Sequence, residues 1–78
     1  MSRTGILIKE KREKLDMTQD QLASKLGCSS VFISRVENGS NGTLIPLERF
    51  YSCIRILKLN RASSIKLLRQ DYLERMKL

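Results

Sequence analysis

The residues best suited to contact another molecule share one face of a short predicted helix, residues 30–38. Phe32, Ile33 and Val36 fall on one side of this segment and predict a buried stripe. The other side carries short polar side chains and one arginine: Ser30, Val31, Ser34, Arg35 and Asn38. Serine hydroxyls donate and accept hydrogen bonds, whereas arginine is a forked donor. Such a face favours close approach of the helix backbone to a partner.

A preceding helix, residues 19–26, has clear start and stop signals. Thr18 and Gln21 have the spacing of a capping box, in which each side chain accepts a hydrogen bond from the other residue's backbone amide. Gly27 ends the helix, because glycine readily takes the left-handed conformation needed there. The predicted buried positions are Leu22, Ala23 and Leu26.

The two helices are joined by a tight turn, because only Gly27 and Cys28 separate the first helix from Ser29, the predicted cap of the second. Gly39 ends the second helix. Two helices joined in this way form a helix-turn-helix when small and apolar residues occupy the right positions. The residues that fit this spacing are Gln19, Ala23, Gly27, Ile33 and Val36.

Three further helices are predicted, and no segment alternates like a half-buried strand. The first runs roughly from Thr4 to Leu15, the fourth begins near Pro46, and the fifth runs from about Ala62 or Ser63 to the C-terminus. Ser40–Thr43 is a loop by composition. Predicted core faces are Ile8, Arg12 and Leu15; Leu47, Phe50, Tyr51, Ile54 and Leu57; and Ile65, Leu68, Tyr72, Leu73 and Met76. The expected fold is all-α, a compact five-helix bundle, with residues 1–78 as one domain.

Composition excludes several kinds of site. The chain has 78 residues, no histidine and only two cysteines, so His-based catalysis, zinc binding and four-cysteine metal centres are not expected. We therefore predict no enzyme, no cofactor and no small-molecule ligand. Without a signal peptide or membrane span, a cytoplasmic protein is expected, with Cys28 and Cys53 as free thiols.

The formal net charge of +7 favours an anionic partner such as nucleic acid or an acidic membrane surface. Residues 40–78 hold eight of the basic residues against three acidic ones, so the excess is not concentrated in the two helices described above. Six basic residues of this half either form a solvated face or provide long-range attraction to DNA: Arg49, Arg55, Lys58, Arg61, Lys66 and Arg69.

Residues 17–27 resemble the second helix of Cro/C1-type (XRE-like) helix-turn-helix proteins, and residues 32–39 resemble the end of their recognition helix. The similarity covers roughly residues 6–59. It implies a lambda-repressor-like fold that binds double-stranded DNA. The chain also resembles controller proteins of restriction–modification systems in its size, the aromatic Phe32 and the fifth helix. Phage and plasmid regulators share this plan.

The resemblance implies a role for each matching position. Residues facing the major groove would be Ser29, Ser30, Val31, Ser34 and Arg35. Residues along the phosphate backbone would be Thr18, Gln19, Asn38, Ser40, Asn41 and Thr43. Arg12 and Glu37 match positions that form a salt bridge in several members, tying the first helix to the end of the third.

The chemistry of these side chains agrees with that assignment. The major groove is about 12 Å wide and admits a helix, and Arg35 can donate to both O6 and N7 of guanine. Val31 can touch a thymine methyl group. Many relatives carry Arg or Gln where this chain has Ser30, so DNA shape is expected to contribute more of the specificity.

A two-fold dimer is expected, because family members generally bind half-sites about 34 Å apart. Ile56, Leu67 and Leu78 lie opposite the main apolar stripes of the helices over residues 46–78, which suggests burial against a second copy. The alternative is scattered surface hydrophobes.

The sequence thus predicts a regulator that binds a palindromic operator and represses or autoregulates its own promoter. An antitoxin-type protein that mainly binds a partner protein is the first alternative. A membrane-surface peptide is the second, disfavoured by Asp71 and Glu74 in the basic last helix.

Overall fold

The chain is all-helical in the computed structural model, which describes residues 2–76. The α-helices of this part are α1 (Arg3–Lys14), α2 (Gln19–Leu26), α3 (Ser30–Asn38), α4 (Leu47–Ile56) and α5 (Arg61–Arg75). A short 3-10 turn, η1 (Ser40–Gly42), stands in the segment that the sequence predicted as a loop. The all-α fold class is confirmed. Pro46 lies one residue before α4, as its N-cap.

The caps of α2 and α3 are confirmed. Thr18 Oγ1 accepts from the Gln21 amide at 3.1 Å, and Gln21 Oε1 accepts from the Thr18 amide at 2.8 Å. Ser29 Oγ accepts from the Phe32 amide at 3.1 Å and so begins α3. Gly27 ends α2 with φ of 70°, in the left-handed region that glycine tolerates.

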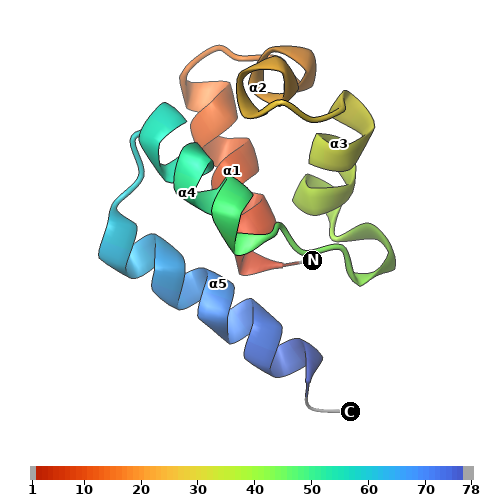
Figure 1. Cartoon of the computed structure of the whole chain (residues 1–78), viewed down its shortest axis with the longest axis vertical. Coiled ribbons are helices and arrows are strands. Elements are labelled where there is room, and N and C mark those ends of the chain that lie inside the picture. Colours follow the sequence, from red (N-terminus) through yellow and green to blue (C-terminus); the bar gives the residue numbers. More distant parts are fainter. Residues whose placement is uncertain (1, 77–78) are drawn as a thin grey trace.

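The core lies where α1, α2, α3 and α4 meet. α5 packs against α1 and runs across the lower part of the molecule in Figure 1. Ile8, Leu22, Ile33 and Phe50 each come from a different one of the first four helices, and each is almost completely buried. α5 adds the buried Leu68 to this core, and the half-buried Ile65 packs against it. Burial of these side chains is the main stabilising contribution to so small a domain.

The predicted core faces of α4 and α5 are wrong in part. Phe50, Ile54 and Leu57 are buried and Ile65 is half-buried, but other residues of the predicted stripes are exposed: Leu47 by 47%, Tyr51 by 49%, Tyr72 by 36%, Leu73 by 49% and Met76 by 77%. Leu15 at the end of α1 is exposed as well, by 41%. The apolar stripes of α4 and α5 are therefore wider than the part that this core covers.

A polar contact explains how α5 is rotated. Asp71 is buried, and its carboxylate accepts hydrogen bonds from the backbone amides of Arg3 at 3.1 Å and Thr4 at 2.9 Å. These amides begin α1, where a negative charge is stabilised by the helix dipole. Because Asp71 turns toward α1, the neighbouring Leu73 and Met76 turn toward solvent.

Both cysteines are free thiols. Cys53 is fully buried, and burial raises the pKa of its thiol to about 12. At neutral pH this thiol is protonated and behaves as a small apolar side chain.

Arg49, one of the basic residues of the second half, is half-buried and donates to the Leu26 carbonyl at the end of α2 at 2.7 Å.

Candidate nucleic-acid interface

The face of α3 that carries the predicted base-contacting residues points outward. Val31 is 56% exposed, Arg35 is exposed, and Ser30 and Ser34 are half-buried. Ser29 is exposed at the N-cap, where its oxygen caps the helix and its hydrogen remains free to donate. The structure thus brings Ser29, Ser30, Val31, Ser34 and Arg35 together on one accessible surface.

The buried side of α3 holds the helix close to α1. Ile33 and Val36 are 1% exposed and lie in the core. A Cβ atom added to Gly5 in α1 would lie 2.2 Å from the Val36 carbonyl oxygen and 3.1 Å from that of Glu37. Only a residue without a side chain fits there, so Gly5 sets the distance between α1 and the end of α3.

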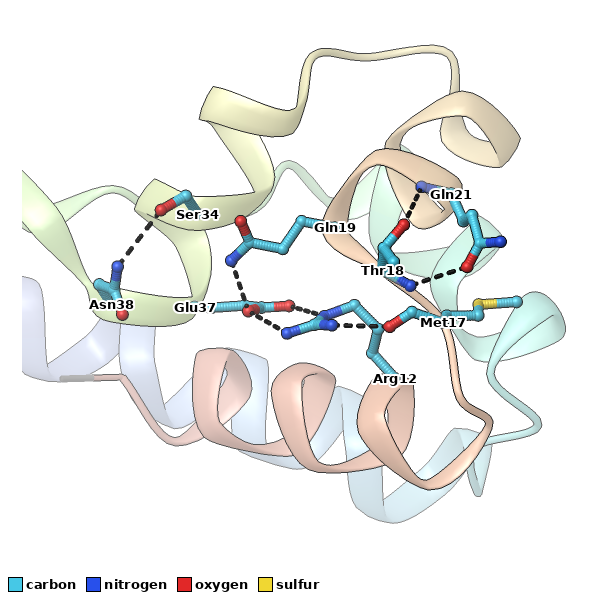
Figure 2. Close-up of polar contacts among 8 residues, drawn as sticks. All are labelled: Arg12, Met17, Thr18, Gln19, Gln21, Ser34, Glu37 and Asn38. Carbon is cyan, nitrogen blue, oxygen red and sulfur yellow. Dashed lines mark hydrogen bonds and ion pairs between the residues drawn. The ribbon is translucent and has the colours of Figure 1, made fainter.

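Arg12 and Glu37 form a bidentate ion pair between the same two helices (Figure 2). Arg12 Nε donates to Glu37 Oε2 at 2.7 Å and Arg12 Nη2 donates to Oε1 at 3.1 Å. Arg12 Nη1 donates to the Met17 carbonyl at 2.7 Å, which ties the α1–α2 turn into the same network. Both side chains are buried, and hydrogen bonding to Glu37 raises the pKa of the Arg12 guanidinium.

Gln19 joins this network from the first turn of α2. Its Nε2 donates to Glu37 Oε1 at 3.1 Å, and Figure 2 shows its amide lying between α2 and the end of α3. Gln19 is half-buried, so one N–H and the carbonyl oxygen remain for a further partner. Glu37 therefore positions one residue on α1 and one on α2.

The other residues predicted along the phosphate backbone lie on two segments. Thr18 is exposed at the start of α2, beside Gln19. Asn38 is exposed at the end of α3, and its Nδ2 donates to Ser34 Oγ at 3.3 Å. Ser40 and Thr43 lie at η1, where Thr43 Oγ1 donates to the Ser40 carbonyl at 2.7 Å. Asn41 belongs to η1 by its backbone, and its side chain is outside what the structure describes.

Of the residues predicted for a dimer interface, the structure describes Ile56 and Leu67. Ile56 is half-buried and packs against the core of its own chain. Leu67 is half-buried on α5. Leu78 lies outside the described residues. The strongly exposed apolar side chains of α4 and α5 are Leu47, Tyr51, Leu73 and, at the end of α5, Met76.

Sequence reasoning missed three polar contacts that shape this surface. Nothing local marks Glu37 as the partner of Gln19, or Asp71 as the acceptor for the first amides of α1, because the paired residues are far apart in sequence. The Tyr72 hydroxyl donates to the Ile45 carbonyl at 2.9 Å, across a separation of 27 residues. The one available signal was an aspartate, Asp71, between apolar residues of a predicted core stripe.

A comparison with known families decides the classification. A family model described as helix-turn-helix matches residues 8–62, which is more than half of the chain. The chain belongs to the Cro/C1-type helix-turn-helix family. This helix-turn-helix protein is a DNA-binding transcription regulator of that type, and such a domain is regulatory rather than typically enzymatic. No curated protein and no solved structure matches the chain.

Two further observations concern other kinds of site. Over residues 2–76, no helix combines the length and apolar character needed to cross a membrane. The same residues contain no cluster of three or more cysteine and carboxylate side chains that could hold a metal ion.

Proposed function

We propose that this helix-turn-helix protein binds a specific palindromic operator as a homodimer in the cytoplasm and regulates its own promoter. In this proposal α3 lies in the major groove, and the start of α2 and the η1 segment contact the phosphates on either side. The observation that carries the proposal is the outward face of α3. It combines short side chains with one exposed arginine, while its opposite side is locked to α1 by Arg12, Glu37 and Gly5.

The start of α2 suits a phosphate group. The backbone amides of Gln19 and Asp20 make no hydrogen bond within the described part of the chain, whereas the Gln21 and Leu22 amides both bond Thr18. Free amides and the positive end of the helix dipole together favour an anion at this place. The free N–H of the Gln19 amide adds a donor whose direction is set by Glu37.

Binding to a pool of random duplexes tests the proposed function. The expected result is enrichment of a short inverted repeat whose half-sites are about one helical turn, roughly 34 Å, apart. Enrichment of a single half-site would contradict the dimer, and no enrichment would contradict sequence-specific binding. A reporter driven by the chain's own promoter then tests autoregulation, with repression as the expected result.

Arg35→Ala is expected to weaken binding to the enriched duplex by roughly 1–3 kcal/mol, or about five-fold to 160-fold. Arg35 is the exposed charged side chain on the outward face of α3, so its loss removes the strongest donor to a guanine. Fluorescence anisotropy with the enriched duplex and with duplexes changed at single positions measures both affinity and base preference. Preference should relax at one base-pair position.

The matched comparison is Gln19→Ala, which removes a proposed phosphate contact instead of a base contact. This variant should weaken binding to the enriched and to random duplexes alike, because phosphates carry no sequence information. If Arg35→Ala gave the same uniform loss, Arg35 would be a phosphate contact, and the assignment of base contacts to α3 would lose its main residue.

Dimer formation through α4 and α5 is supported by the exposed apolar side chains on these helices. Leu73→Asp and Leu67→Asp place a charge on two different sides of α5, and both are expected to shift the chain toward monomer. Leu73→Asp should act more strongly, since Leu73 is 49% exposed and contributes less to the chain's own core. Sedimentation equilibrium measures the shift. An unchanged dimer in both variants would exclude α5 from the interface.

A further inference from the structure

The segment between η1 and α4 carries part of the proposed phosphate contacts but is held by few bonds. The Thr43 amide and hydroxyl both donate to the Ser40 carbonyl, which closes the η1 turn on itself. Beyond Thr43, the Ile45 side chain is buried in the core. A hollow lies beside the segment, lined in part by Ser2, Gly42 and Leu44. Within the turn itself, Ser40 and Gly42 are exposed.

One hydrogen bond ties the backbone of this segment to a distant helix. Tyr72 Oη on α5 donates to the Ile45 carbonyl at 2.9 Å. The adjacent Asp71 holds the first amides of α1, whose Gly5 lies against the end of α3. Asp71 thus fixes α1, which packs against the recognition helix α3. The neighbouring Tyr72 fixes the segment that follows α3.

The Tyr72 ring is well placed to keep this hydroxyl in position. It lines an apolar groove between α4 and α5 together with Leu47, Ile65 and Leu68, and the residue is 36% exposed. A ring packed on one side has few rotamers, so the hydroxyl reaches the Ile45 carbonyl at a small entropic cost. The bond holds the peptide group between Ile45 and Pro46, two residues after Thr43.

We propose that Tyr72 is a positioning residue for DNA binding: its hydroxyl holds the 43–45 segment so that η1 meets the phosphate backbone. The inference rests on the proposed function, and Tyr72 itself touches no DNA in it. It assigns to α5 a role in DNA affinity that is separate from dimer formation.

Tyr72→Phe tests this role, because it keeps the ring and removes only the hydroxyl. We expect binding to the enriched duplex to weaken roughly three-fold to ten-fold, the range of a single lost hydrogen bond. The loss should be the same on random duplexes, because phosphate contacts carry no sequence information. The slope of log affinity against log salt should stay the same, because residues 40–45 carry no charged side chain. Base preference should be unchanged. Amide hydrogen exchange of residues 43–45 in the free protein should become faster.

Ser63→Ala is the matched control, because it also removes one hydroxyl hydrogen bond of α5, donated to Asn60 Oδ1 at 3.1 Å, but none that reaches the 43–45 segment. It should leave affinity, salt slope and exchange unchanged. Unchanged affinity in Tyr72→Phe, with or without a lower melting temperature, would overturn the positioning role. No duplex binding by the unsubstituted chain would instead overturn the proposed function, and the role of Tyr72 with it.

Discussion

Glu37→Ala is expected to lower the free energy of unfolding by about 3–5 kcal/mol, the cost of leaving one member of a buried ion pair without its partner. Glu37 is 1% exposed and accepts hydrogen bonds from Arg12 and from Gln19. A chain of 78 residues has a total stability of only about 4–12 kcal/mol, so this loss is a large fraction of it. Urea denaturation followed by circular dichroism measures the change.

Two controls separate the ion pair from the general effect of substitution. Glu10→Ala removes an exposed carboxylate of α1 that has no ion pair within residues 2–76, and it should change stability by less than about 0.5 kcal/mol. The double variant Arg12→Leu/Glu37→Leu removes both charges and should recover most of the loss, because no buried charge is left unpaired. A Glu37→Ala variant as stable as the parent chain would contradict the account of how α3 is anchored.

Gly5→Val is expected to cost about 3 kcal/mol, because the added Cβ would lie 2.2 Å from the Val36 carbonyl oxygen. That oxygen belongs to the backbone of α3 and cannot rotate away, so α1 and α3 must separate. The end of the recognition helix then moves relative to α2, and DNA affinity should fall together with stability. Thermal unfolding and anisotropy measure the two effects.

Ser24→Val is the matched control for Gly5→Val. Ser24 is exposed on α2, and serine and valine have similar helix propensities, so this variant should stay within about 0.5 kcal/mol of the parent. If Gly5→Val were equally neutral, the close approach of α1 to α3 would not control the position of the recognition helix.

The α2–turn–α3 unit could be predicted from the sequence because its signals are local. Thr18 and Gln21 cap α2, Gly27 takes the left-handed conformation, and Ser29 caps α3, all within a dozen residues of chain. The outward direction of Ser30 and Arg35 followed from the apolar residues on the opposite side of α3. Local hydrogen bonds and helical period therefore sufficed to place α2, α3 and the outward face of α3, whereas the DNA contacts assigned to that face stay a prediction.

The faces of α4 and α5 could not be predicted in the same way. Periodicity finds an apolar stripe, but it does not show which part of the stripe meets the chain's own core. Leu73 and Met76 are exposed because α5 is rotated by Asp71, whose partners in α1 are 67 and 68 residues away in sequence. Such tertiary contacts leave no pattern in the segment that makes them.

The most direct test of the central claim, that the outward face of α3 enters the DNA groove, is a map of backbone amide chemical shifts in the protein during titration with the enriched duplex. The account predicts the largest changes at residues 29–35, with further changes at Thr18, Gln19 and residues 40–43. Changes confined to α4 and α5, with residues 29–35 unaffected, would contradict it.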